Sequence, residues 1–363
     1  MSKIVLMAGG TGGHLFPAMA LAQELHRNGH EVYLMSDSRV DAFGQGFPAK
    51  EIHVVPSATP SISHPIKFIK AGFTIVKGIF IAWRKLSKIK PDVVVGFGGY
   101  PVFPPLLAAS LMGIPSILHE QNAVLGRANR ALARFADALA LSFEFTSFAD
   151  RFRLDQVVTG NPVRDRVIQT AKTISYSKLK KTDKIKLLVF GGSQGARVFS
   201  DLVPEAIALM DKDLRKRLDI VQQCRTEDLE RVASSYAKAK VNVELAAFFT
   251  DLPERMGQSH LVIARSGASS VAELTVLGRP AILIPLPSSL DGDQANNAAF
   301  IEASGGGWLL EQASISPLSL AKQLQTLFNE PEILNDAAKN AKLLAQPDAV
   351  IKLAKLVEKY SKL

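Results

Sequence analysis

The sequence predicts an α/β protein with two doubly wound, parallel-sheet domains that face a cleft. A pattern of apolar strand, glycine turn and helix occupies residues 4–22, and it returns at 187–197, about half a chain later. Short apolar runs alternate with helical stretches along the chain, as such domains require. A length of 363 residues also exceeds what one ordinary core needs, which favours two domains.

Composition limits the class of protein. Hydrophobic residues make up 47% of the chain and charged residues 21%, which is typical of a folded globular protein. A single cysteine, Cys224, excludes an intrachain disulfide framework and fits a reducing compartment. No signal-peptide pattern and no apolar run of roughly 18 residues is present, so we expect a cytoplasmic protein. The formal charge of +9 favours an anionic partner without choosing among nucleic acid, a phosphorylated metabolite and an acidic membrane surface.

Apolar runs locate the strands. In the first half we expect strands at Ile4–Met7, Glu31–Ser36, Asp92–Gly96, Ser116–His119 and Ala138–Leu141. In the second half we expect them at Leu187–Phe190, Asp219–Gln223, Asn242–Ala246, Leu261–Ala264, Pro280–Pro285 and Trp308–Leu310.

The domain boundary is expected near residue 163. Gly160-Asn161-Pro162 and the Lys-rich stretch 172–186 have the composition of a linker. We therefore expect domains at 1–163 and 164–340. The C-terminal run 331–363 has helical periodicity, and we expect its last part, 341–363, to pack back on the first domain.

The first glycine turn, Ala8–His14, invites comparison with a dinucleotide-binding fingerprint. That fingerprint needs a third glycine at position 15, where Leu15 stands, although Asp37 can still serve as a ribose ligand. His14 closes the turn at the carboxyl end of the first strand, where side chains point at ligands. It can act as a general base on a hydroxyl or donate a hydrogen bond to it, or it can simply pack locally.

Polar side chains also follow the strand at 116–119. His119 and Glu120 can exchange a proton, and Gln121 and Asn122 can read sugar hydroxyls; the structural alternative is a loop that caps a helix at 123–134. At the domain junction, Arg164 can reach a phosphate or pair with a surface carboxylate.

In the second half, a helix is expected to start after the strand Leu261–Ala264. Its free N–H groups and partial positive charge suit a diphosphate. Ser266, Ser270 and Glu273 are spaced to share one face, and Glu273 lies roughly 9 Å beyond Gly267, a fitting offset for a ribose diol.

Two further segments of the second half have polar or aromatic side chains at expected strand ends. The polar cluster Asp291–Asn297 follows the strand at 280–285. Phe248–Leu252 can offer backbone groups and an aromatic wall to a flat base, or pack in the core.

Residues 66–88 have the clearest helical periodicity in the chain. Lys67, Lys70, Lys77, Arg84, Lys85 and Lys88 fall within an arc of about 100°, beside a wide apolar face. Such a helix can lie in a membrane interface, pack on the core with its lysines in water, or do both with different parts of its face. Elsewhere, no Cys/His set has metal-ligand spacing and no P-loop is present, so neither a metal nor a cofactor is expected.

Taken together, several motifs resemble the MurG family, the peptidoglycan N-acetylglucosaminyltransferases of GT-B fold that make lipid II. The motifs run in family order over residues 4–300: Gly9–His14, Gly98–Tyr100, His119–Asn122, Gly160–Pro162, Gly191–Ala196, Arg265–Gly267 with Glu273, and Asp291–Asn297. The resemblance implies inverting transfer of N-acetylglucosamine from UDP-N-acetylglucosamine to the C4 hydroxyl of undecaprenyl-diphospho-N-acetylmuramoyl-pentapeptide.

The resemblance also implies residue roles. His14 is the implied base or hydroxyl orienter, with His119 and Glu120 lining the acceptor side. The implied donor contacts are Thr11, Gly12 and Gly13 near the donor, Asn122 and Gln294 on its sugar, Arg164, Ser193, Ala268, Ser269 and Ser270 on the diphosphate, Glu273 on the ribose, and backbone near Phe249 on uracil. The first domain would bind the acceptor and the second the donor.

The implied location is the cytoplasmic face of the bacterial inner membrane, as a peripheral protein. The segment from Ile66 would contact the anionic surface, and proteins of cell-wall synthesis or division are implied as partners, whereas nucleic acid is not. Two positions depart from the family pattern: Pro101–Pro105 replaces a glycine-rich loop, and Asp293 replaces a basic or polar residue.

Two alternatives stay open. A hydrolase or epimerase acting on UDP-N-acetylglucosamine would share the architecture and need no lipid. A non-catalytic nucleotide-sugar sensor would keep the 266–273 segment and need neither His14 nor His119-Glu120.

Overall fold

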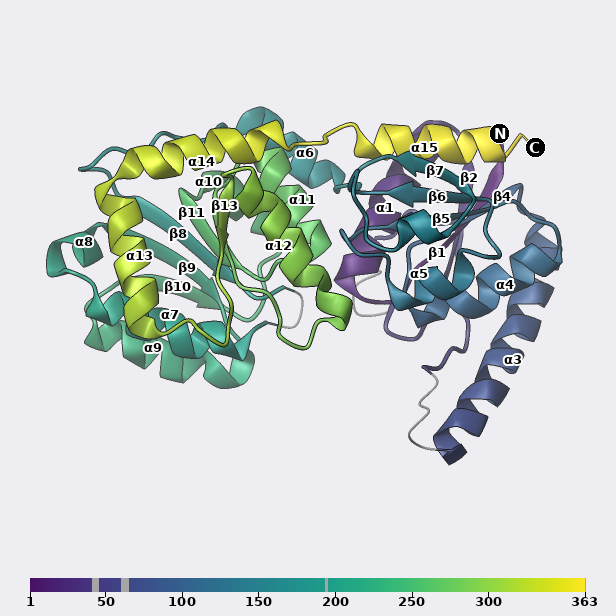
Figure 1. Ribbon diagram of the computed structural model, residues 1–363, viewed down its shortest axis with the longest axis horizontal. Coiled ribbons are helices and arrows are strands. Elements are labelled where there is room, and N and C mark those ends of the chain that lie inside the picture. The colour runs from purple at the N-terminus through teal and green to yellow at the C-terminus, as the bar shows by residue number, and fades with distance from the viewer. Residues whose placement is uncertain (41–45, 60–64, 193–194, 363) are drawn as a thin grey trace. The chain divides into compact units, whose positions relative to one another are not determined.

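The computed structural model describes residues 1–40, 46–59, 65–192 and 195–362 (Figure 1). This part of the chain divides into two compact units. Unit 1 comprises Met1–Asp165 and Pro347–Leu363, and unit 2 comprises Arg166–Gln346. The C-terminal segment therefore belongs with the N-terminal half of the sequence.

Unit 1 is built on a parallel sheet. Within its described residues the sheet has seven strands in the order β3-β2-β1-β4-β5-β6-β7. Their bounds are β1 Lys3–Met7, β2 Glu31–Ser36, β3 Glu51–Val54, β4 Val93–Gly96, β5 Ser116–Glu120, β6 Ala138–Leu141 and β7 Asp155–Val158. The sequence prediction located β1, β2, β4, β5 and β6 to within a residue at each end, and it missed the two edge strands β3 and β7.

Helices cover both faces of this sheet. Ile4 and Leu6 of β1 pack in one cluster with Leu21 of α1 and Leu353 of α15, whereas Val5 of the same strand faces the layer formed by α3 and α4. Because successive side chains of a strand point to opposite faces, this alternation places β1 at the centre of the unit. Among the described residues of unit 1, the α-helices are α1 Gly12–Arg27, α3 Pro65–Ile89, α4 Phe103–Leu111, α5 Arg127–Leu132 and α15 Ala349–Tyr360.

Unit 2 repeats the same plan. Its described residues form a parallel sheet of six strands in the order β10-β9-β8-β11-β12-β13. The bounds are β8 Ile185–Phe190, β9 Leu218–Gln223, β10 Val243–Ala246, β11 Leu261–Ala264, β12 Ala281–Leu283 and β13 Gly307–Leu309. These strands coincide with those expected from the sequence, with ends that differ by up to two residues.

The helices of unit 2 flank that sheet. Where the structure describes this unit they are α6 Asp165–Thr173, which starts at the last residue before the unit, α7 Arg197–Leu209, α8 Lys212–Arg217, α9 Leu229–Lys238, α10 Leu252–Gln258, α11 Ala268–Leu277, α12 Asp293–Ala303, α13 Pro317–Asn329 and α14 Pro331–Leu343. Apolar residues of β8, β9, β11 and β12 pack with α7, α9 and α13 in one core cluster. Each unit thus has its own hydrophobic core.

In each sheet, the direction in which successive strands are added reverses at one point. In unit 1 the chain order runs outward from β1 through β2 to β3 on one side and from β4 to β7 on the other; in unit 2 the same reversal occurs between β8 and β11. Open parallel sheets bind ligands outside the carboxyl ends of the strands at such a switch point. The fold therefore defines one candidate site in each unit.

Candidate active site

His14 lies at the switch point of unit 1. It belongs to the first turn of α1, directly after β1, and it is half-buried. From the neighbouring strand β4, the backbone of Gly98 and Gly99 approaches the imidazole ring. A Cβ atom at Gly99 would lie 3.4 Å from Nε2 of His14, and the φ of +78° at this position favours glycine. The glycine at position 99 therefore leaves room for the backbone to lie close to that ring nitrogen.

Hydrogen bonds connect His14 to the end of β5. Nδ1 of His14 lies 3.1 Å from Oε1 of Gln121. Nε2 of Gln121 lies 2.9 Å from Nδ1 of His119 and donates to the His119 carbonyl oxygen at 3.0 Å. Nε2 of His119 lies 3.0 Å from the carbonyl oxygen of Gly160. His119 is completely buried, and this burial lowers its pKa to about 4, although the Gly160 contact acts in the opposite direction.

Glu120 has a different set of partners. Its side chain is only 2% exposed. Oε1 accepts hydrogen bonds from the backbone N–H and the side-chain amide of Asn122, and Oε2 accepts from the Gly126 N–H and the Asn129 amide. His119 and Glu120, which the sequence allowed to exchange a proton, hydrogen-bond to different groups. The Glu120 carboxylate holds the loop after β5 in place.

The other residues of unit 1 that we expected to contact the sugar donor lie around the same switch point. Thr11 is the N-cap residue of α1, with Gly12 buried and Gly13 exposed in its first turn. Asn122 follows β5 and is half-buried. The guanidinium of Arg164 stacks on Phe16 of α1, 4.2 Å from the ring centre. Arg164 therefore contacts α1 at Phe16, which is two residues after His14 in the sequence.

The Asp37 carboxylate, which could have bound a ribose, already has hydrogen-bond partners within the protein. Its carboxylate accepts hydrogen bonds from the Gly10 N–H and from the backbone and guanidinium of Arg39. Burial by itself raises the pKa of Asp37, but the hydrogen bonds from Arg39 and Gly10 outweigh that effect, so its pKa is lowered. Together with the buried Leu15, this pairing leaves the dinucleotide-binding interpretation without support.

In unit 2, Gly191 follows β8 and Arg265 follows β11, and these two strands are paired at the switch point. A Cβ atom at Gly191 would lie 2.3 Å from the backbone nitrogen of Ala196, so only glycine fits this turn. Ser193, which we expected on the diphosphate, lies outside the described residues. After β11, helix α11 starts at Ala268 with Gly267 as its N-cap residue. Ala268, Ser269 and Ser270 form its first turn, where backbone N–H groups have no acceptor within the helix.

The structure corrects one detail of the predicted face. Ser266 precedes the helix instead of sharing a face with Ser270 and Glu273, and its hydroxyl donates to the carbonyl oxygen of Gln294 at 2.7 Å. Glu273 lies on α11, one turn beyond Ser269, and is 5% exposed. The Gln294 side chain accepts from the Leu286 N–H at 3.0 Å. The polar segment after β12 is thus tied to the start of α11.

Arg265 and Phe249 of unit 2 make contacts that the sequence did not predict. Arg265 donates to the carbonyl oxygens of Ile284 and Pro285 and to Gln312, and burial lowers its pKa. It therefore links the ends of β11 and β12. The Phe249 ring is buried and covered by the guanidinium of Arg255, 4.3 Å from the ring centre. Any exposed aromatic wall comes instead from Phe248, which is 58% exposed.

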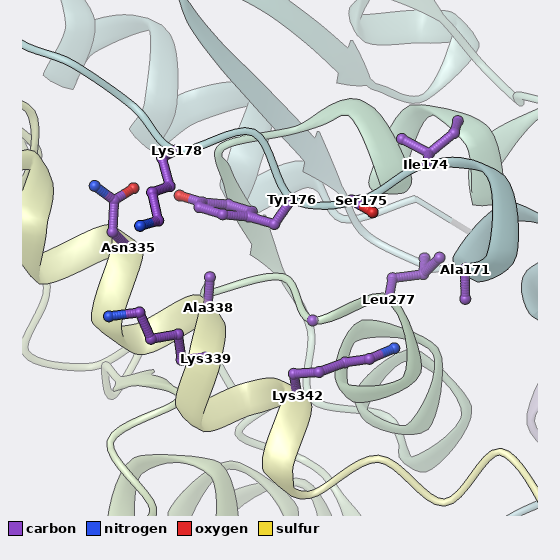
Figure 2. A pocket seen from close by; sticks show the side chains of 11 residues that line it. Ala171, Ile174, Ser175, Tyr176, Lys178, Leu277, Asn335, Ala338, Lys339 and Lys342 are labelled. Carbon is purple, nitrogen blue, oxygen red and sulfur yellow. The ribbon is translucent and has the colours of Figure 1, made fainter.

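A cavity of about 290 Å³ lies elsewhere in unit 2 (Figure 2). Tyr176, Leu277 and the lysines Lys178, Lys339 and Lys342 are among the residues that line it. Leu277 is the last residue of α11, so the cavity lies at the opposite end of that helix from Ala268, roughly 14 Å along its axis. This cavity is therefore separate from the switch point.

Two Rossmann-like units, whose strand orders agree except for the additional edge strand β7 of unit 1, each carry polar and glycine turns at the switch point and define the GT-B fold class of glycosyltransferases. Residues 4–141 match the glycosyltransferase family 28 N-terminal domain, and residues 186–353 match the glycosyltransferase family 28 C-terminal domain. The chain belongs to glycosyltransferase family 28.

Relatives support this assignment over the full length. A protein from Rhizobium rhizogenes is 50% identical over 360 residues, which cover 99% of this chain and 96% of the relative. It is named UDP-N-acetylglucosamine–N-acetylmuramyl-(pentapeptide) pyrophosphoryl-undecaprenol N-acetylglucosamine transferase. The resemblance to the MurG family read from the motifs is thereby confirmed.

Solved structures show the same fold. The crystal structure of MurG from Acinetobacter baumannii has a TM-score of 0.78 and 30% identity, and the match covers 98% of this chain and 99% of that chain. A UDP-N-acetylglucosamine 2-epimerase from Neisseria meningitidis has a TM-score of 0.68 at 16% identity, with 98% and 100% covered. The second likeness concerns the fold alone.

In unit 1, the sequence did not predict that Gln121 and Asn129 hydrogen-bond to other residues of the candidate site. Gln121 was considered only as a sugar contact, yet it is 2% exposed and joins two histidines. Asn129 donates both to Glu120 and to the His119 carbonyl oxygen. No local pattern marks either residue, because their partners come from distant segments of the chain.

Proposed function

We propose that this protein transfers N-acetylglucosamine from UDP-N-acetylglucosamine to the C4 hydroxyl of undecaprenyl-diphospho-N-acetylmuramoyl-pentapeptide, forming lipid II. One observation supports this proposal most directly. A relative that is 50% identical over the full length has this activity in its name, and the glycine and polar motifs of this chain lie at the switch points of two parallel sheets. Ligand chemistry in such sheets takes place at those points.

The nucleotide part of the donor belongs on unit 2. The diphosphate is assigned to the first turn of α11, at Ala268, Ser269 and Ser270, where the helix dipole and backbone N–H groups that have no acceptor within the helix attract negative charge. As the bond to the sugar breaks, charge develops on this diphosphate, and the same groups stabilise it. Glu273, about one turn further on, is assigned to the ribose diol, and Gln294 to the sugar.

The acceptor hydroxyl belongs near His14 on unit 1. In an inverting transfer the C4 oxygen bonds to the anomeric carbon on the face opposite the departing UDP, and the hydroxyl proton must go to a base. His14 is the candidate, because it is half-buried at the switch point and its Nε2 lies beside the Gly99 backbone. Glu120 is occupied by four donor groups from Asn122, Gly126 and Asn129, which argues against its acting as the base.

A lipid acceptor requires a protein that reaches the membrane surface. No helix in the described part of the chain is long and apolar enough to cross a bilayer. Helix α3 instead divides into three sectors. Ala71, Ala82 and Leu86 face the protein; the apolar side chains Ile69, Phe73, Val76, Phe80 and Trp83 are exposed within an arc of about 80°; and Lys70, Lys77, Arg84, Lys85 and Lys88 form an exposed stripe beside them.

This arrangement supports peripheral membrane contact. Exposed aromatic and aliphatic side chains lie next to cations, which is the pattern of a helix that inserts one face between anionic headgroups. Figure 1 shows α3 beside α4, with its N-terminal half extending away from the sheet of unit 1. We place unit 1 on the inner membrane surface through this sector.

Transfer of label tests the reaction. Purified protein is incubated with radiolabelled UDP-N-acetylglucosamine, with and without the lipid-linked acceptor, and label in the lipid phase and release of UDP are followed. Label in lipid only when acceptor is present is expected. Release of UDP without acceptor would support a hydrolase or epimerase instead, and tight donor binding without turnover would support a sensor.

The His14→Ala variant tests the base. We expect turnover to fall roughly 10²- to 10⁴-fold while UDP-N-acetylglucosamine binding is kept. Unchanged turnover would remove His14 from the mechanism. His26→Ala is the matched control, since His26 lies on the same helix and its side chain is exposed.

Vesicle binding tests the membrane contact. A Phe73→Ser, Phe80→Ser double variant is expected to lose binding to anionic vesicles while it retains donor binding. The control is Leu318→Ser with Leu343→Ser, which removes two exposed apolar side chains from unit 2. Equal loss in both double variants would contradict the assignment to α3.

A further inference from the structure

A chain of hydrogen bonds in unit 1 links His14 to a backbone carbonyl far away in sequence. It runs from the Gly160 oxygen through His119 and Gln121 to Nδ1 of His14, with distances of 3.0, 2.9 and 3.1 Å. His119 and Gln121 each have partners on both sides along this chain. The position of every proton along the chain therefore follows from its first link.

The first link determines the form of His119. A carbonyl oxygen only accepts, so Nε2 of His119 must carry a proton. The buried ring stays neutral near pH 7, because burial holds its pKa at about 4. A neutral imidazole has one N–H, so Nδ1 of His119 is bare and accepts from the Gln121 amide.

The second link determines the orientation of the Gln121 amide. Its nitrogen donates both to Nδ1 of His119 and to the His119 carbonyl oxygen. The reversed amide would place its oxygen against two acceptors, which is unfavourable in a buried site. Oε1 of Gln121 therefore faces His14.

The third link determines the form of His14. Because Oε1 only accepts, Nδ1 of His14 carries the proton, and Nε2 keeps its lone pair in the neutral ring. We infer that Gln121 is a positioning residue that holds His14 in this tautomer, so that Nε2 is available to take the proton of the acceptor hydroxyl. This inference rests on the proposed function.

The chemistry explains why the tautomer matters. The opposite tautomer would present an N–H to the acceptor hydroxyl and could not take its proton. In the form assigned, the hydroxyl proton moves to Nε2 as the oxygen bonds to the anomeric carbon and the bond to UDP breaks. The resulting imidazolium keeps its Nδ1–H bond to Gln121.

The tautomer can be read directly from the ring nitrogens. Full-length protein labelled with ¹⁵N in its histidines is studied by NMR near pH 7 without substrate, with His14→Ala and His119→Asn used to assign the signals. We expect a protonated Nδ1 and a bare Nε2 for His14, and the reverse for His119. A protonated Nε2 in His14 would overturn the inference, and this result needs no variant of Gln121.

The Gln121→Met variant tests the functional consequence. We expect kcat to fall about 10- to 100-fold, KM for UDP-N-acetylglucosamine to change less than about twofold, and the His14 signals to shift toward the other tautomer. The matched control is Gln156→Met, because Gln156 also lies in unit 1 and donates to the carbonyl oxygens of Ala149 and Phe152, away from His14 and His119. Unchanged kcat in a folded Gln121→Met protein would refute the positioning role.

Failure of the proposed function has a separate signature. A wild-type protein that shows no transfer to the lipid acceptor refutes the function, whatever the spectrum shows. A protein that does transfer the sugar but carries the other tautomer refutes only the role assigned to Gln121.

Discussion

Replacing Glu120 with glutamine tests whether its carboxylate stabilises the structure or takes part in the reaction. The two side chains have the same shape, but one carboxylate oxygen becomes an NH₂ group. Oε1 accepts from the two Asn122 nitrogens at 3.0 and 3.1 Å, and Oε2 accepts from Gly126 and Asn129 at 2.8 Å each. Whichever oxygen is replaced, an amide nitrogen then faces two donors.

The magnitude follows from those contacts. Two hydrogen bonds to a charged acceptor are lost, at about 1.5–3 kcal/mol each, and the buried charge is also removed, which offsets part of the loss. We therefore expect Glu120→Gln to lower the free energy of unfolding of unit 1 by about 3 kcal/mol. For a unit of this size that corresponds to a fall of roughly 6–12 °C in Tm.

Two measurements check this expectation. Calorimetry follows the transition of unit 1, and hydrogen exchange follows the amide protons of Asn122 and Gly126, which should lose protection. Glu144→Gln serves as the control, because Glu144 is exposed in the same unit. If Glu120→Gln keeps wild-type stability and exchange but loses turnover, the reasoning is refuted and Glu120 acts in the chemistry.

Further predictions concern the remaining parts of the two sites. The pKa of His119 is about 4 in the folded protein and about 6.5 when unfolded, so the unfolded state binds more protons between these values. The stability of unit 1 should therefore fall by about 3 kcal/mol as the pH is lowered through this range, and His119→Asn should remove that slope in denaturant titrations. Gly191→Ala should lower the Tm of unit 2, since the new Cβ meets the Ala196 backbone, whereas Gly267→Ala adds a Cβ with nothing within 4 Å and should leave Tm unchanged. If the diphosphate binds at the start of α11, Gly267→Ala should nevertheless weaken UDP binding in calorimetry. Glu273→Gln should weaken UDP-N-acetylglucosamine binding roughly 10- to 100-fold but leave binding of a 2′,3′-dideoxy analogue unaffected; equal weakening of both ligands would contradict the assignment to the diol.

Local chemistry was enough to predict most of the fold. Strands buried on both faces, such as β1 and β11, are apolar runs that end in glycine turns, and such runs are visible in any sequence. The edge strands β3 and β7 were missed because they are short and largely exposed, with sequences Glu51–Val54 and Asp155–Val158 that contain few apolar residues in a row. Only their pairing with β2 and β6 identifies them as strands.

Helix α3 shows the limit of periodicity. The sequence predicted a helix with a wide apolar face and a basic stripe, and the structure contains that helix from Pro65 to Ile89. Periodicity could not say which part of the apolar face is covered. The packing of Ala82 and Leu86 against the core decides it, and leaves Phe73 and Phe80 exposed.

The candidate site likewise has some features that the sequence predicts and others that only the structure shows. By itself, the sequence determined the order of the motifs, the glycine turns and the acidic residue after a helix start, because each depends on residue types at short spacing. Only the tertiary structure decided how Gly160, His119, Gln121 and His14 are connected. A tautomer depends on the direction of a hydrogen bond, and here that direction is set by a backbone carbonyl 41 residues away in the chain from the histidine it contacts.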